Sequence, residues 1–340
     1  MGNTSILAAI IKCEVSMSIH CAICFRDDSG SYYKNAYVTL LSLFENTTHP
    51  VIVHVLHDET IVHGEQALRE LCQRYGQAVL FHAVPSLDEE TTKAITERYS
   101  IGATYRYYIH ELVDADEAIY LDCDIIVNRD IHDLSSIKLD NHLVAAVLDA
   151  HSYWKKGAPR PKYARMVEYH GLLPESYINT GVMLLNLKKL RETFGAENIF
   201  ITKTLASVRD NIPCYYPDME IINSVLAAVP GSVMLLNERF NLWHNALHYG
   251  LEELGDTFFH FVIKPDSAFY PAHLLFWKYY AKAPFADDMF DRMAKAYASP
   301  AMNFVQAYCA NARHRNHAIA LLKYGAWGAL VQTIKRKLRR

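Results

Sequence analysis

Residues Ile119-Tyr-Leu-Asp-Cys-Asp-Ile-Ile-Val127 form an apolar run that two carboxylates interrupt. Burying a carboxylate is costly unless it is paired or binds a metal. Side chains alternate along a strand, so we expect Asp122 and Asp124 on one face, about 7 Å apart, and Cys123 on the other. Two carboxylates at that spacing can hold a hard divalent cation, which prefers oxygen ligands. The run therefore predicts a buried strand that carries a metal site, whereas Asp114-Ala-Asp116 has the same spacing by chance in a turn.

Short apolar runs alternate with segments of helical period on both sides of this run. Strands are expected at residues 20–25, 51–57, 79–83, 118–127, 143–148 and 182–186, and helices at residues 33–46 and 61–75. This alternation predicts a sheet whose faces are covered by helices. Residues 152–174 lack periodicity and are expected to form a long surface loop, of the kind that often serves as a lid. From about residue 271 onward the pattern is helical.

The composition is that of a folded α/β protein. With 51% hydrophobic and 21% charged residues among 340, the sequence excludes disorder, collagen and a coiled coil. Seven scattered cysteines, an odd number, indicate no disulfide framework and favour a reducing compartment. Cys21 and Cys24 have zinc-knuckle spacing, but in a strand they would face opposite ways. No run reaches the roughly 18 apolar residues that a membrane span needs, so we expect a cytoplasmic protein.

The charge is unevenly distributed along the chain. Residues 292–340 contain ten basic and no acidic residues, whereas the net charge of the whole chain is −3. The acidic body argues against general binding of nucleic acid. In the tail, Ile319, Leu322, Ala326, Leu330 and Ile334 recur at helical spacing before a basic end at 335–340. A helix of this kind predicts docking on an anionic membrane surface, so peripheral attachment to the inner face of the plasma membrane is expected.

Two classes of enzyme place an Asp-x-Asp at the end of a strand. Phosphatases of the haloacid-dehalogenase type use the first Asp as a nucleophile, normally near the start of the chain. Nucleotide-sugar glycosyltransferases use the pair to hold a metal, after an N-terminal nucleotide-binding half. Here the pair follows about 120 residues of α/β pattern, which favours the second class.

Several blocks, in the same order, resemble glycosyltransferase family 8, a family of retaining enzymes with the GT-A fold. The similar blocks are residues 23–33, 103–107, 120–127, 147–149, 177–187, 218–223, 236–243 and 260–265. The resemblance implies a GT-A, Rossmann-like α/β fold with a mixed sheet flanked by helices. It implies a glycosyltransferase domain over residues 19–290, followed by a helical, basic C-terminal extension over residues 291–340.

The same resemblance implies roles for individual residues. Residues expected at the nucleotide or its phosphates are Asp27 or Asp28, Arg106, Asp122 and Lys264. Residues expected to bind the metal, Mn²⁺ or Mg²⁺, are Asp122, Asp124 and His260. Residues expected at the sugar or the acceptor are Asp218, Asp149 and Asn179. Met219 departs from the family, which has a Gln beside the anomeric carbon, and Asp266 stands where the family has a Trp.

The function that the resemblance implies is metal-dependent transfer of glucose or galactose from a UDP-sugar, with retention of configuration. The acceptor would be a hydroxyl of a glycan or of a lipid-linked glycan, as in lipopolysaccharide biosynthesis. Two alternatives stay open. One is a catalytically degenerate protein that binds a nucleotide sugar without transferring it, which would explain Met219. The other is a nucleotidyltransferase of similar fold. Such an enzyme needs a basic phosphate-binding loop after the first strand, whereas this sequence has the acidic turn Arg26-Asp-Asp-Ser-Gly30 there.

Overall fold

The computed structural model of the chain describes residues 18–297, apart from residues 150–152, 196–197, 244–245, 247–248, 262–264, 266 and 268–269. Its residues divide into two units. The first comprises residues up to 37, 47–123 and 130–240, and the second comprises residues 38–46, 124–129 and 241 onward. Lys264 and the basic tail after residue 297 lie outside the described residues, so their predicted roles remain predictions.

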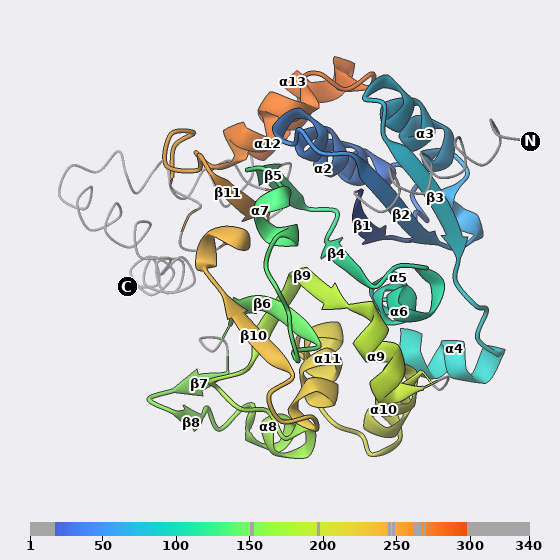
Figure 1. The fold of residues 1–340 in the computed structure, drawn as a ribbon, viewed down its shortest axis with the longest axis vertical. Helices are drawn as coiled ribbons and strands as arrows, with labels where there is room; N and C mark the ends of the chain where they lie inside the picture. Colours follow the sequence, from blue (N-terminus) through green and yellow to red (C-terminus); the bar gives the residue numbers. More distant parts are fainter. Residues whose placement is uncertain are drawn as a thin grey trace, which may run out of the picture. The chain divides into compact units, whose positions relative to one another are not determined.

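The first unit is built on a seven-stranded sheet with the order β10-β6-β9-β4-β1-β2-β3 (Figure 1). The strands are β1 (Ile19–Cys24), β2 (Val51–His57), β3 (Ala78–Ala83), β4 (Glu117–Leu121), β6 (Val144–Leu148), β9 (Ile178–Asn186) and β10 (Val233–Leu236). β9 runs antiparallel to β4 and β6, and the other neighbouring pairs are parallel. The expected mixed sheet is therefore confirmed. The carboxyl ends of β1, β2, β4 and β6 share one edge.

Helices cover both faces of this sheet. The helices are α3 (Gly64–Arg74), α4 (Glu89–Thr96), α5 (Ile101–Thr104), α6 (Ile109–Leu112), α7 (His132–Ser135), α8 (Ala164–His170), α9 (Leu187–Phe194), α10 (Ile199–Arg209) and α11 (Pro217–Ala227). One core joins strand residues such as Ala22 and Met183 to α10 and α11 through Phe200 and Ile221. On the opposite face, α3 buries Leu68, Leu71 and Cys72. Burial of these apolar side chains stabilises the layered arrangement.

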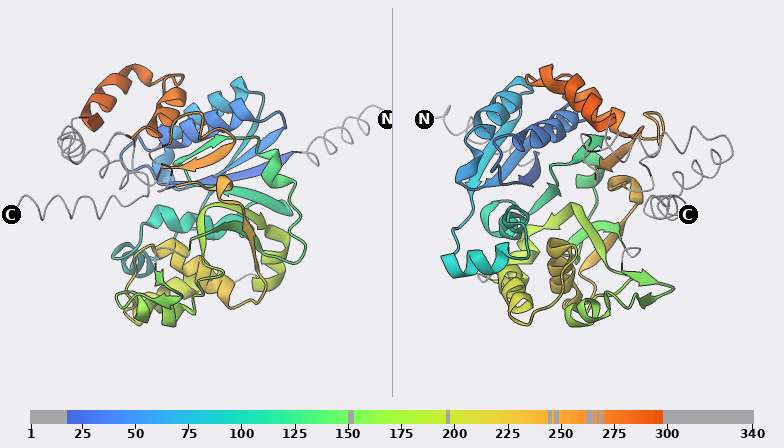
Figure 2. Two further views of the ribbon diagram at one scale, coloured as in Figure 1. Left: turned by 90° about the vertical axis from the view of Figure 1, so that its left-hand side faces the viewer. Right: turned by 180° about the vertical axis from the view of Figure 1, so that it is seen from behind.

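The second unit contains the end of α2 (Tyr33–Asn46), the antiparallel pair β5 (Ile125–Asn128) and β11 (Thr257–His260), and the helices α12 (His273–Tyr280) and α13 (Met289–Tyr297), orange in Figure 2. The Asn46 amide joins three of its parts, because it donates to the Ser42 and Val127 carbonyls and to the Tyr279 hydroxyl. Among the residues described, no helix has the length and apolar character that crossing a membrane requires.

The structure corrects two expectations. The single strand expected over residues 118–127 is two strands, because β4 ends at Leu121 and β5 begins at Ile125. The amide of Asp122 still donates to the carbonyl of Gly181 in β9, whereas Ile125 pairs with His260 of β11. The change of partner makes Asp122-Cys-Asp124 a turn, so the expected alternation of faces does not apply there.

The long surface loop expected over residues 152–174 is also wrong. It contains the hairpin β7 (Trp154–Lys155) and β8 (Ala158–Pro159), and then α8. Tyr153 and Trp154 are buried with Met166 and Val167 in a second core. Aromatic side chains supply this burial without a regular period in the sequence, because each ring buries a large apolar area.

Candidate active site

Arg106 connects two of the predicted site carboxylates within the first unit. It lies in a 3₁₀ helix, η2 (Tyr105–Tyr108), and its side chain is 8% exposed. Its guanidinium is 2.8 Å from Asp122, which follows β4, and 3.0 Å from Asp218 in the first turn of α11. Burial alone lowers the pKa of Arg106, but the charges of Asp122 and Asp218 raise it well above its usual value. The cluster therefore keeps one cation between two anions at the edge of the sheet.

Tyr120 contacts both Asp122 and Arg106 of this cluster. Tyr120 lies in β4, two residues before Asp122, and its hydroxyl donates to the carboxylate of Asp122. The Arg106 guanidinium lies 4.8 Å from the centroid of the Tyr120 ring. Arg106 also donates to the Thr180 carbonyl and hydroxyl. Asp122 and Arg106 are thus held from several directions before any substrate binds.

Asp149 and Asn179 meet at the same edge of the sheet. Asp149 directly follows β6, and Asn179 lies near the start of β9, which runs the opposite way. Both are buried, and the Asn179 amide donates to Asp149 over 3.3 Å. Asn223 of α11 exchanges two hydrogen bonds with the backbone of Ile178, which ties α11 to β9 beside this pair. Asn223 belongs to the block 218–223 that resembles the family, but the sequence predicted no role for it.

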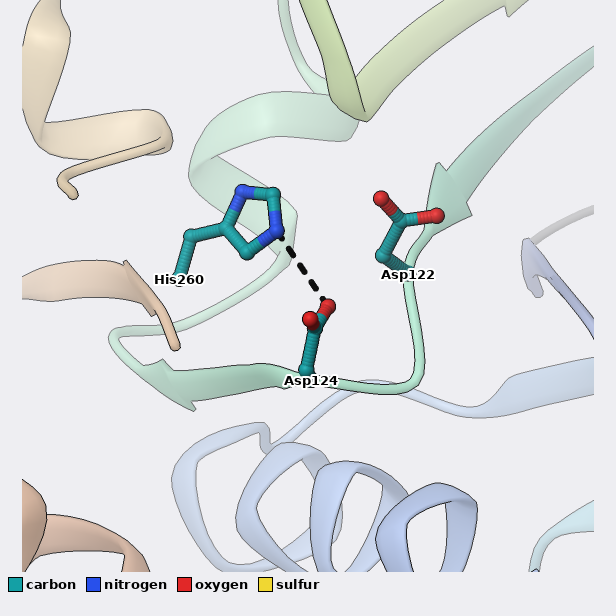
Figure 3. Close-up of side chains that lie close together, drawn as sticks. All are labelled: Asp122, Asp124 and His260. Atoms are coloured by element: carbon teal, nitrogen blue, oxygen red, sulfur yellow. Dashed lines mark ion pairs between the residues drawn. The ribbon is translucent and has the colours of Figure 1, made fainter. Parts of the chain in front are cut away.

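His260 and Asp124 lie in contact in the second unit, with 3.2 Å between Nε2 and a carboxylate oxygen, and they form an ion pair when the imidazole is protonated (Figure 3). His260 ends β11, and the amide of Phe261 donates to the carbonyl of Asp124 over 2.9 Å. The other ring nitrogen, Nδ1, lies 3.2 Å from the Asn241 side-chain oxygen. Only Cys123 separates Asp124 from Asp122, so the chain itself keeps their Cα atoms within about 7 Å. Two carboxylates and an imidazole are a donor set that suits Mn²⁺.

The two candidate nucleotide-binding aspartates differ in their surroundings. The carboxylate of Asp27, 3% exposed, accepts the amides of Ser31, Tyr32 and Tyr33 at the start of α2. Asp28 is 69% exposed and pairs with Arg26. Asp27 thus shapes the turn, and Asp28 presents its carboxylate at the surface.

Sequence reasoning missed a polar group beside this turn. Asp58 directly follows β2 and accepts hydrogen bonds from the Tyr105 hydroxyl, over 2.6 Å, and from Arg26, over 2.8 Å. A carboxylate directly after a parallel strand was the signal that could have found it, because ligands gather at this edge in open α/β sheets.

The departure at Met219 has a structural context. Met219 packs beside the core of Tyr153, Trp154 and Tyr177. The neighbouring Glu220 is fully buried and accepts hydrogen bonds from the Tyr153 hydroxyl and from the amides of residues 215 and 216. Burial raises the pKa of Glu220. Glu220 therefore holds the turn that precedes α11.

Several cationic side chains lie on and after the β7–β8 hairpin. Lys155, Lys156 and Arg160 are exposed. The Lys162 ammonium lies 4.9 Å from the centroid of the Tyr215 ring.

Comparison with known proteins places this arrangement in a family. A model of glycosyl transferase family 8 matches residues 20–257. A Haemophilus influenzae protein that carries a provisional glycosyltransferase name is 26% identical over 216 residues, 63% of this chain and 61% of its own length. The lipopolysaccharide 1,2-glucosyltransferase of Escherichia coli is 25% identical over 148 residues, 43% of this chain and 40% of its own length. The chain thus spans less than two thirds of the length of either relative.

Solved structures show the same fold. The galactosyltransferase LgtC, in complex with donor and acceptor sugar analogues, superposes with a TM-score of 0.57 at 18% identity. The match covers 83% of this chain and 98% of that chain. The GT-A fold expected from the sequence is confirmed. Because the family model matches well over half of its residues, the chain belongs to glycosyl transferase family 8.

Proposed function

We propose that the protein transfers glucose or galactose from a UDP-sugar to a hydroxyl of a glycan or lipid-linked acceptor, with retention of configuration. Membership of the family supports sugar transfer. A relative named as a lipopolysaccharide glucosyltransferase and a neighbour named as a galactosyltransferase support these sugars and this class of acceptor. The observation that carries the proposal is the Arg106 cluster, which holds Asp122 and Asp218 at the carboxyl edge of the sheet.

A divalent cation, Mn²⁺ or Mg²⁺, is part of the proposal, and Asp122, Asp124 and His260 are the residues that would hold it. A cation bound there would neutralise the charge of the departing diphosphate as a Lewis acid. The ion pair between Asp124 and His260 supports this assignment, because it already brings an oxygen and a nitrogen ligand together.

The remaining roles in the proposal are those that the family resemblance implies. Asp218 and Asp149 would accept hydrogen bonds from sugar hydroxyls, and Asn179 would contact the sugar or the acceptor. Asp27 or Asp28 would contact the nucleotide, and Lys264 the phosphates. Arg106 would act beside the nucleotide while it orients Asp122 and Asp218.

Bond-making in this reaction needs no protein nucleophile. The bond from the anomeric carbon to the diphosphate oxygen breaks, and a bond to the acceptor oxygen forms on the same face of the sugar. The acceptor's proton passes to the departing phosphate oxygen. The residues of the chain bind and orient both substrates.

A screen of nucleotide sugars tests the proposal. Purified protein with Mn²⁺ is given UDP-glucose or UDP-galactose, with or without lipopolysaccharide or lipid-linked acceptors, and UDP release and glycosylated product are measured. We expect UDP release that depends on an acceptor and an α-linked product. Release of pyrophosphate from a sugar phosphate and a nucleotide would instead indicate a nucleotidyltransferase. Binding of a UDP-sugar without turnover with any acceptor would indicate a degenerate binding protein.

Peripheral membrane attachment through the basic tail is a separate part of the proposal, and its support is the sequence alone. Ten basic residues follow Asp291, with an apolar stripe and Trp327 before the last six residues. Each basic residue near an anionic surface contributes about 1 kcal/mol. Sedimentation with anionic vesicles should recover the full chain but not a chain that ends at Asn316. Equal recovery of both chains, or binding that salt does not weaken, would contradict the attachment.

A further inference from the structure

Backbone pairing places two side chains on either side of His260. β5 lies along one side of β11, with Ile125 opposite His260, and it brings the preceding Asp124 alongside. On the other side, the Leu242 amide donates to the Phe258 carbonyl, and the His260 amide donates to the Leu242 carbonyl, both over 2.8 Å. These hydrogen bonds fix Asn241, the residue before Leu242, beside the histidine.

The side chains continue this arrangement. His260 is 7% exposed, and Asn241 is fully buried. His260 Nε2 lies 3.2 Å from an Asp124 carboxylate oxygen, and Nδ1 lies 3.2 Å from the Asn241 side-chain oxygen. An imidazole that binds a metal through Nε2 is neutral and carries its proton on Nδ1, so Nδ1 needs a hydrogen-bond acceptor. The Asn241 oxygen is placed to be that acceptor.

We propose that Asn241 is a positioning residue that fixes the tautomer and the ring orientation of His260 for metal binding. This inference rests on the proposed function, because it takes His260 to be a metal ligand. With Nδ1–H donated to Asn241, the lone pair of Nε2 points toward Asp124. If the Asn241 amide were turned so that its nitrogen faced Nδ1, the ring proton would sit on Nε2, and the imidazole could not bind a cation there.

Two substitutions at one position separate these arrangements. Asn241→Asp keeps an acceptor and removes the only donor that the side chain could offer, whereas Asn241→Leu removes both. Asn128→Leu is the matched control. Asn128 also lies in the second unit, and its side chain hydrogen-bonds Leu254 and Tyr279 rather than His260.

The experiment measures Mn²⁺ binding by the full chain in the presence of UDP, from the electron paramagnetic resonance signal of free Mn²⁺. Loss of an outer partner of a metal ligand typically weakens metal binding 10- to 100-fold, and we expect a loss of about this size for Asn241→Leu. Asn241→Asp and Asn128→Leu should stay within about threefold of the unmodified protein. With diamagnetic Mg²⁺ and UDP bound, long-range ¹H–¹⁵N spectra of the imidazole should show the His260 proton on Nδ1 in the unmodified protein and in Asn241→Asp.

Two results would overturn the positioning role while leaving the proposed function in place. One is Mn²⁺ binding by Asn241→Leu as tight as in the unmodified protein. The other is equal weakening in Asn241→Asp and Asn241→Leu. Absence of Mn²⁺ binding in the unmodified protein would overturn both this inference and the metal part of the proposed function. Acceptor-dependent UDP release measured in parallel would show whether sugar transfer itself still stands.

Discussion

Two clusters of polar side chains on the sheet of the first unit differ in charge: one is made of ions and the other of neutral rings. At the strand ends, Arg106 pairs with Asp122 and Asp218, so charge is gathered and neutralised by opposite charge. Diagonally across β1, β2 and β3, the rings of His20, His54 and His82 hydrogen-bond in series, with 2.9 Å between their nitrogens at each step.

These three histidines, here called the histidine ladder, are uncharged at neutral pH because their pKa values are lowered. The rings lie nearly parallel, with centroids 5.1 and 5.2 Å apart. His54 is 2% exposed, and burial together with its two histidine neighbours lowers its pKa to about 3. Burial also lowers the pKa of His20, against the charge of Asp114, and that of His82, where His57 adds to the effect. Neutral histidines thus hydrogen-bond one another within the strands, whereas the carboxyl ends of the strands carry charged side chains that can interact with a charged ligand.

Removing a charge from the turn Asp122-Cys-Asp124 should have the largest effect on activity. Asp122→Asn or Asp124→Asn should lower the rate of sugar transfer at least about a hundredfold, as expected for a main electrostatic stabiliser. Chelation with EDTA should reproduce the loss. The exposed Asp287→Asn is the control, and circular dichroism should show that all three variants stay folded. Full activity of Asp124→Asn in EDTA would rule out the metal role.

Arg106→Lys tests whether one cation must serve two carboxylates. An ammonium is a point charge that cannot reproduce the planar fork of a guanidinium, so one of the two pairs should weaken. We expect kcat/KM to fall about tenfold to a hundredfold and the free energy of unfolding to fall by about 1.5–3 kcal/mol, the usual contribution of a charged hydrogen bond. Urea unfolding and steady-state kinetics measure the two effects. Unchanged values would mean that the bridge between Asp122 and Asp218 is dispensable.

The histidine ladder should make the free energy of unfolding depend on pH. A histidine whose folded pKa lies below its unfolded value of about 6.5 contributes stability above that pH and loses it as the pH falls. His54, with a folded pKa of about 3, should cost up to about 1.4 kcal/mol per pH unit below about pH 6. His54→Leu should flatten this slope in urea unfolding between pH 5 and 8. Substitution of the exposed His63 by Leu should leave it unchanged, and equal slopes in all three proteins would contradict the assignment.

The fold was more predictable from the sequence than the site. Local apolar patterns predicted α2 and β2 with the bounds that the structure has, because each element contains a continuous run of buried residues. The break between β4 and β5 was missed because it depends on a change of partner from β9 to β11, far away in the sequence. The aromatic core around Tyr153 was missed because its residues follow no period.

Within the site, some residues could be predicted from the sequence and others only from the contacts in the structure. Asp122 and Asp124 could be named because charged residues that interrupt an apolar run are visible in one sequence, whereas Asp149 and Asp218 were named only through the family resemblance. The partners that orient them, such as Tyr120 and Asn241, could not, because their polar atoms become informative only when the contact is known. The roles predicted for Asp149, Asn179 and the other site residues remain predictions until they are tested.

Met219→Gln should have the smallest effect, and in the opposite direction. It adds a hydrogen-bonding group next to Asp218, at the position where the resemblance expects a Gln beside the anomeric carbon. An amide there can stabilise charge that develops in the transition state, so sugar transfer or hydrolysis of the UDP-sugar should rise severalfold. The gain is limited because residue 219 packs beside an aromatic core, where a polar group loses hydration. Met219→Leu, which keeps an apolar side chain of similar volume, is the control and should leave turnover unchanged. If both variants have the turnover of the unmodified protein, residue 219 lies outside the catalytic site, and the strand-end cluster acts without it.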